Sequence, residues 1–194
     1  MARRYVAGDL PRQPVLAEYG ASFQAFVAGY EPAASLPYLA DVARLDWALN
    51  LAFHSPATNP LTAADLSSLP AERVAELPLA LAPGAAILRS SYPIDRIWQA
   101  SQPGAADETV DLGAGGVNLL VLRREDDAAF VRVSDAEGAF LSAAGRGETL
   151  EEAVQVGFRT DAAFDLSTTF TRMLALKAIA AMQHRFAGRF EKAP

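Results

Sequence analysis

The side chains that most often carry enzyme chemistry are scarce in this chain. It has no cysteine, which excludes disulfides, thiolate metal sites and cysteine nucleophiles. Its two histidines, His54 and His184, lie far apart in the sequence and fit no metal-ligand spacing. The acidic runs REDD and TLEEA are typical of a turn and of a first helical turn, not of a buried acid–base pair. We therefore expect a protein that is not an enzyme, with no catalytic residue, no metal ligand and no cofactor.

A glycine-rich segment, TVDLGAGGVNLLV at residues 109–121, resembles the cofactor loop of S-adenosylmethionine methyltransferases. Such loops bring the backbone close to the cofactor at the start of a helix. Here Val117 stands where a third glycine belongs, and the residues that follow are typical of a strand. A glycine-rich turn that leads into a strand is the better interpretation.

The segment AAILRSSYPIDRIWQASQP, residues 85–103, combines a small apolar run, a turn and a short amphipathic helix. We expect Tyr92 and Trp98 to pack between a sheet and its helices, because large aromatic side chains do so more often than they bind ligands. Arg89 closes the apolar strand, where an arginine usually has a carboxylate or backbone partner. These three residues are our candidates for contact with a peptide or protein partner.

The charge distribution limits the classes of partner. The formal net charge is -6, which opposes non-specific binding of nucleic acid by the whole surface. Basic residues nevertheless gather near the C-terminus, Arg172 and Arg185 among them. These basic residues have two interpretations. They form a solvated helix face with cations near a helix C-terminus, or they form a local patch for an acidic peptide or nucleic acid. No apolar run approaches the length of a membrane span and no secretory signal is present, so we expect a cytoplasmic protein.

The first part of the chain is predicted to be helical. Apolar spacing indicates one helix over residues 14–30, begun by Pro14, and a second over 37–55. Thr62 has the position of a helix cap, and another short helix follows Pro70.

The pattern changes at Pro78, and the second part combines strands with helices. Strands are predicted at 79–82, 85–91, 117–123 and 128–134, the last two forming an antiparallel hairpin with a longer loop. Helices are predicted at 135–144, at 149–160 behind a Thr149–Glu152 capping box, and from Asp165 through Ala181. The predicted fold class is α+β: a helical N-terminal part, residues 1–77, and an α+β domain with a small antiparallel sheet, residues 78–194.

Four segments resemble the HvfC/BufC-type proteins in order and spacing. They are LPYLADVARLDWALNLAFHS, LAPGAAILRSSYPIDRIWQASQ, VNLLVLRREDDAAFVRVS and GRGETLEEAVQVGFRTDAAFDLSTTFTRMLALKAI. The resemblance covers the chain from about Arg3 to Ile179. The sequence departs from the family pattern at Ala82, where members commonly have a histidine, and at the N-terminus. There the chain resembles only the end of the helical domain that carries the family's DNA-binding label.

The resemblance implies a role in the biosynthesis of ribosomally made, modified peptides. Such proteins are similar to the partner subunit of methanobactin biosynthesis, which acts with a TIM-barrel, multinuclear non-haem iron oxidase. It implies an adaptor that binds a precursor peptide and docks it on the oxidase, which supplies the iron ligands. Arg89, Tyr92 and Trp98 are then expected at the interface, with Arg172 and Arg185 as electrostatic support. The alternative is a DNA-binding transcriptional regulator, which needs a recognition helix with several exposed basic side chains.

Overall fold

The computed structural model describes residues 1–11, 15–57, 59–105 and 109–181, and the chain has an α+β fold. It divides into two units: Met1–Ser55 with Leu88–Arg132, called the first unit, and Pro56–Ile87 with Val133–Pro194, called the second unit. Each unit therefore combines chain from both sides of residue 77, where the sequence suggested a division.

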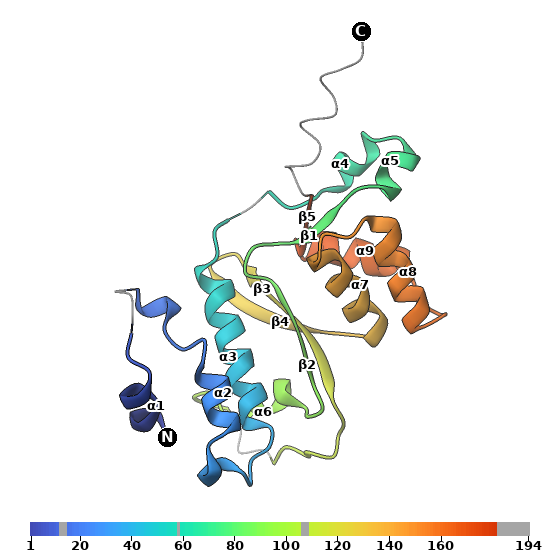
Figure 1. Ribbon diagram of the computed structural model, residues 1–194. Coiled ribbons are helices and arrows are strands. Elements are labelled where there is room, and N and C mark those ends of the chain that lie inside the picture. Colours follow the sequence, from blue (N-terminus) through green and yellow to red (C-terminus); the bar gives the residue numbers. More distant parts are fainter. Residues whose placement is uncertain (12–14, 58, 106–108, 182–194) are drawn as a thin grey trace. The chain divides into compact units, whose positions relative to one another are not determined.

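The α-helices and the strands carry the labels of Figure 1. The helices are α1 (Ala2–Gly8), η1 (Leu16–Glu18), α2 (Phe23–Ala28), η2 (Glu31–Ala33), α3 (Leu39–His54), α4 (Ala63–Ser67), α5 (Ala71–Ala75), α6 (Ile94–Ala100), α7 (Asp135–Gly145), α8 (Leu150–Thr160) and α9 (Leu166–Ala175). The strands are β1 (Leu79–Leu81), β2 (Ala86–Ser90), β3 (Val117–Arg124), β4 (Asp127–Val133) and β5 (Ile179–Ala181).

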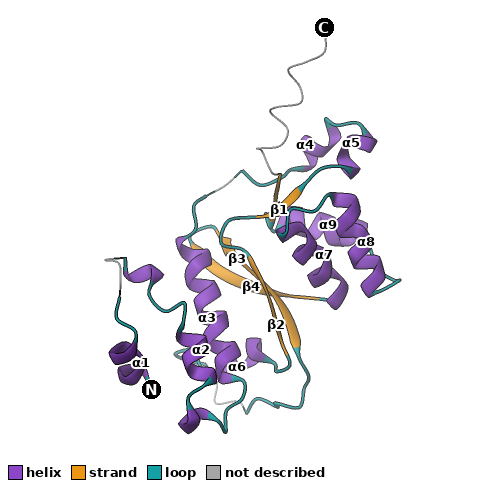
Figure 2. Ribbon diagram, in the orientation of Figure 1, coloured by secondary structure: helices purple, strands orange, loops and turns teal. Residues whose placement is uncertain are grey.

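The core of the first unit forms where α3 packs against β3. The helix buries a stripe of residues at spacings of three and four, which are Val42, Leu45, Ala48 and Ala52. The strand contributes four consecutive residues, Leu119 to Leu122, that are at most 1 % exposed. β3 is the central strand of the sheet β2-β3-β4, drawn in orange beside α3 in Figure 2, and α6 packs on both α3 and β3.

The hairpin β3–β4 is confirmed, but its loop has only the two residues Glu125 and Asp126 instead of the longer loop expected. Glu125 has a φ of 52°, in the left-handed region that a two-residue hairpin loop requires at its first position. The Arg123 side chain donates to the Glu125 carbonyl at 3.1 Å and also to the carbonyl of Ser55, which caps α3. One arginine thus ties the hairpin loop to the end of the principal helix.

The single helix expected over residues 14–30 is wrong: the described part of this segment forms η1 and α2, with turns between them. Gly20 has a φ of 128°, which interrupts the helix, and a Cβ there would lie 3.4 Å from the ring of Trp47. Pro14, the expected start, lies outside the described residues. Aromatic residues of this segment still pack on a neighbouring helix: the ring of Phe23 lies against that of Tyr5 in α1, with ring centres 5.0 Å apart.

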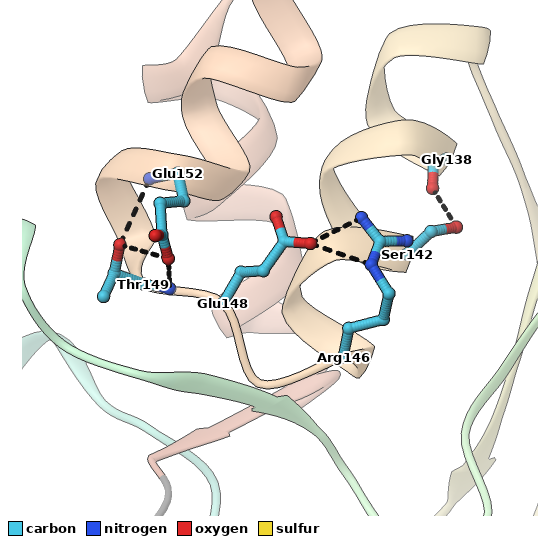
Figure 3. Close-up of polar contacts among 6 residues, drawn as sticks. All are labelled: Gly138, Ser142, Arg146, Glu148, Thr149 and Glu152. Carbon is cyan, nitrogen blue, oxygen red and sulfur yellow. Dashed lines mark hydrogen bonds and ion pairs between the residues drawn. The ribbon is translucent and has the colours of Figure 1, made fainter.

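The second unit is built around α7 and α8, which pack on each other, and β1, which contacts α7. Both helices begin with the capping box that the sequence predicted for α8: Thr149 pairs with Glu152, and Ser134 pairs with Glu137 at the start of α7. Figure 3 shows the Thr149–Glu152 cap beside the Arg146–Glu148 ion pair, which closes at 2.7 Å in the connection between the helices. Thr62 likewise caps α4, as expected.

The long final helix expected through Ala181 is wrong, because α9 ends at Ala175 and the chain turns into β5. Lys177 takes a φ of 56°, its N–H donates to the Leu174 carbonyl, and the next N–H, of Ala178, donates to the Met173 carbonyl. This pair of bonds is a Schellman motif, which usually has glycine in the left-handed position. β5 then pairs with β1 in antiparallel register, Leu79 opposite Ala181 and Leu81 opposite Ile179.

Among the described residues, no helix is both long and apolar enough to cross a membrane.

We predict that Lys177→Gly stabilises the protein by about 0.5–1 kcal/mol, because glycine removes the steric cost of the left-handed conformation that ends α9. Urea unfolding followed by circular dichroism measures the change. Ala175→Gly, two residues earlier and inside the helix, is the matched control and should destabilise by about the same amount. Equal destabilisation by both variants would contradict the assignment of Lys177 as the helix stop.

We predict that the cap at Thr149 makes stability depend on acidic pH. The Thr149 backbone N–H and hydroxyl donate to the Glu152 carboxylate and hold the pKa of Glu152 below its ordinary value of 4.5. A lowered folded-state pKa stabilises the fold above that ordinary value, and this stabilisation is lost as the pH falls through the folded-state pKa.

The measurement compares urea midpoints of the wild type and Glu152→Ala over a pH series. The variant should be less stable at neutral pH, and its deficit should shrink as the pH falls below 4.5. Glu151→Ala, next to it in the first turn of α8 and without a role in the cap, is the control. An equal pH-dependent deficit in both variants would mean that the helix dipole, not the cap, is responsible.

Candidate functional site

The candidate site lies in the first unit, where β2 ends and the chain turns into α6. Ser90 is the last residue of β2 and is buried. Its hydroxyl donates to Asp41 of α3 at 2.6 Å and accepts from the Tyr92 N–H at 3.1 Å. Arg44 forms an ion pair with the same Asp41 carboxylate at 3.3 Å. The end of β2 is therefore held on α3 by a connected set of polar contacts.

The glycine-rich segment supports this turn from the β3 side. A Cβ on Gly116 would lie 2.4 Å from the Ser90 carbonyl oxygen, so only glycine fits between the end of β2 and the start of β3. Before it, the Asp111 carboxylate accepts the Gly113 N–H at 2.8 Å, in a side-chain turn. The segment then enters β3 as the sequence interpretation expected, and its glycine is required by backbone packing.

Arg89 presents its side chain to solvent. Its own carbonyl accepts a hydrogen bond from Arg44, which covers part of the β2 backbone. Within the described parts of the chain, the Arg89 guanidinium has no hydrogen-bond or ion-pair partner, contrary to the expected carboxylate or backbone acceptor. An exposed arginine whose guanidinium has no such partner can form charge-assisted hydrogen bonds with an acidic group of another molecule.

Tyr92 and Trp98 are half-buried, so each combines a packing role with an accessible edge. The Tyr92 ring meets Tyr38 edge to face, with ring centres 6.3 Å apart. The Trp98 indole N–H donates to the Asp46 carboxylate of α3, and its ring meets Phe130 of β4 edge to face at 5.4 Å. Half-buried aromatic rings with a fixed orientation are frequent anchors in protein interfaces.

An ion pair that the sequence interpretation did not find joins α6 to β4. Asp95 is only 5 % exposed, and Arg132 donates to both of its carboxylate oxygens, the longer bond measuring 3.0 Å. These bonds raise the pKa of Arg132 above its ordinary value, so the guanidinium keeps its charge at any physiological pH. Phe130 and Arg132 are two residues apart in a strand, so their side chains share the face that α6 covers. The two-residue spacing of Phe130 and Arg132 within a predicted strand was the sequence signal that could have placed them on one face.

β4 is an edge strand of the sheet. A two-residue loop pairs Arg124 with Asp127, so the backbone N–H and C=O groups of Ala128, Phe130 and Arg132 point away from β3. The N–H of Ala128 donates to the Asp127 carboxylate at 2.7 Å. Among the described residues, no backbone group outside the sheet bonds to Phe130. The edge can therefore accept an extended chain as a further strand.

The four candidate residues that the structure describes belong to two different units. Arg89, Tyr92 and Trp98 belong to the first unit, whereas Arg172 belongs to the second. Arg172 forms an ion pair with Glu137 of α7 at 2.8 Å, with 38 % of its side chain exposed, so much of its charge is balanced within the unit. Arg185 and His184 lie outside the described residues.

The described residues were compared with the requirements of a metal centre and of a catalytic pocket. They contain no group of three or more His, Cys, Asp or Glu side chains that could hold a metal ion. His54 lies at the end of α3, where its Nδ1 is 2.9 Å from the Asn50 carbonyl. A hollow of about 500 Å³ beside α6 has Arg96, Gln99, Thr109 and Asp111 in its wall.

Comparison of the chain with models of protein families, with curated proteins and with solved structures finds no match.

We predict that Gly116→Ala destabilises the protein by about 1–3 kcal/mol, because the new methyl group must displace the Ser90 backbone. Chemical unfolding measures the loss. Gly113→Ala is the matched control: its Cβ would meet only the movable Asp111 side chain, at 3.2 Å, so a change under about 0.5 kcal/mol is expected. Similar stability of the two variants would show that β2 and β3 do not approach as closely as described.

Proposed function

We propose that this protein is a non-catalytic adaptor that binds a precursor peptide and docks it on an iron-dependent peptide-modifying oxidase. In this proposal the peptide adds to the sheet of the first unit along β4. The oxidase supplies the iron and the chemistry, and the adaptor works in the cytoplasm without a cofactor of its own.

The edge position of β4 is the observation that carries the proposal. An added strand would bond the outward backbone groups of Phe130, and its side chains would lie beside those of β4. One of its faces would meet the Phe130 ring, which Trp98 supports, and the Arg132 guanidinium, which Asp95 orients. These contacts suit an extended peptide with apolar and acidic side chains on alternate residues.

The resemblance to HvfC/BufC-type proteins supports the second half of the proposal, the docking on an oxidase. Arg89 and Tyr92 are the proposed contacts, because an exposed arginine and a half-buried aromatic ring are frequent energetic centres of protein interfaces. Both lie at the junction of β2 and α6, which Ser90 and Asp41 hold in place, so the enzyme would meet a fixed surface.

The first test uses the full chain, carrying an affinity tag, in lysate from its own source. Retained proteins and peptides are identified by mass spectrometry, and iron is measured in the same fraction. We expect an iron-containing oxidase and a short peptide to be retained together. Arg89→Glu should reduce retention of the oxidase by about tenfold, because it reverses an interface charge. Arg159→Glu reverses an exposed charge on α8 and should change nothing.

A second measurement addresses peptide binding by itself. A synthetic copy of the retained peptide is titrated against the wild type, against Phe130→Ala on β4 and against Phe158→Ala, an exposed ring on α8. Only Phe130→Ala should weaken binding, by about tenfold. Equal affinity in all three would remove β4 from the proposal. Retention of duplex DNA alone, released by salt, would favour the DNA-binding regulator instead.

A further inference from the structure

We propose that β4 also binds a second copy of this chain, in an antiparallel pairing around a two-fold axis at Phe130. This self-association does not depend on the proposed function, since it needs neither a precursor peptide nor an oxidase. It follows from the chemistry of the strand edge and from the order of the side chains along β4.

The edge of β4 lacks two of the features that commonly prevent edge-to-edge pairing. The strand, DAAFVRV, contains no proline and no lysine. Its one cation, Arg132, is bonded to Asp95. At the loop end of the strand, the Ala128 N–H donates to the Asp127 carboxylate. Pairing is therefore most favourable at Phe130, two residues further toward the C-terminal end of β4.

A two-fold pairing centred on Phe130 sets the register of the whole contact. Phe130 of each copy would exchange both backbone hydrogen bonds with Phe130 of the other, and Ala128 would lie opposite Arg132. The two central rings would then form a cross-strand aromatic pair, a favourable contact in sheets. The small Ala128 side chain leaves room for the long Arg132 side chain across from it.

Charge favours the same antiparallel arrangement. The loop end of β4 carries Glu125, Asp126 and Asp127, whereas Arg132 stands at the other end with 51 % of its side chain exposed. Antiparallel pairing places the acidic end of each strand beside the arginine of the other, with Asp126 diagonal to Arg132 and within reach of its long side chain. A parallel arrangement would place like charges together.

Because a contact confined to one short strand buries less surface than stable dimers do, association is expected only at high protein concentration. The same outward groups of Phe130 would bind the peptide of the proposed function. Self-association and peptide binding therefore exclude each other.

The test measures the dissociation constant of the dimer by sedimentation equilibrium for two variants at one position. Ala128→Glu places a carboxylate opposite Arg132 of the other copy and should strengthen the dimer. Ala128→Lys places a like charge there and should weaken it. The two constants should differ by about tenfold or more, since the contact occurs twice in a symmetric dimer. Added salt should reduce this difference.

Amide hydrogen exchange of the wild type locates the contact. The Phe130 amide, which points outward, should gain protection as the protein concentration rises. The Ala129 and Val131 amides point toward β3 and should be protected at every concentration. A wild-type chain that stays monomeric at all concentrations, equal dissociation constants for the two Ala128 variants, or a dimer without protection at Phe130 would each overturn the proposal. None of these outcomes bears on peptide binding.

Discussion

The close approach of β2 and β3 at Ser90 and Gly116 is the constraint on which the first unit depends. A single added methyl group on Gly116 would meet the Ser90 carbonyl, so the backbones touch where the sheet begins. The Ser90 hydroxyl then reaches Asp41, which places α3 on the same junction. A glycine, a serine and an aspartate that are distant in sequence together set the position of the sheet, the principal helix and the turn into α6.

The arrangement of the candidate site follows from that junction. Because α6 starts directly after it, Asp95 and Trp98 face β4, where they hold Arg132 and Phe130. Every contact in this group fixes the direction of a side chain that still has an accessible edge. Such an arrangement holds Arg132, Trp98 and Phe130 in fixed orientations. In the proposed adaptor, these oriented side chains would meet the bound peptide.

Two left-handed residues that are not glycine determine how the chain reverses. Glu125 turns β3 into β4 within two residues, and Lys177 ends α9 so that β5 can pair with β1. In both places the surrounding hydrogen bonds compensate for the steric cost: Arg123 bonds the Glu125 carbonyl, and the Schellman bonds close the end of α9. Glycine usually marks such turns in a sequence. Because neither position is glycine, the sequence favoured a longer loop between β3 and β4 and a longer final helix in place of α9 and β5.

The sequence by itself determined the α+β class, the strands β1 to β4, the principal helix α3 and the cap of α8, because periodicity and capping depend on neighbours in the chain. It also placed Arg89, Tyr92 and Trp98 in one segment of strand, turn and helix. Only the tertiary structure decided that Asp41, Asp46 and Asp95 orient this segment, that Arg172 is paired with Glu137, and that β5 is a strand. Those contacts join residues far apart in the sequence, and no local pattern specifies which partner a carboxylate or a strand edge will meet.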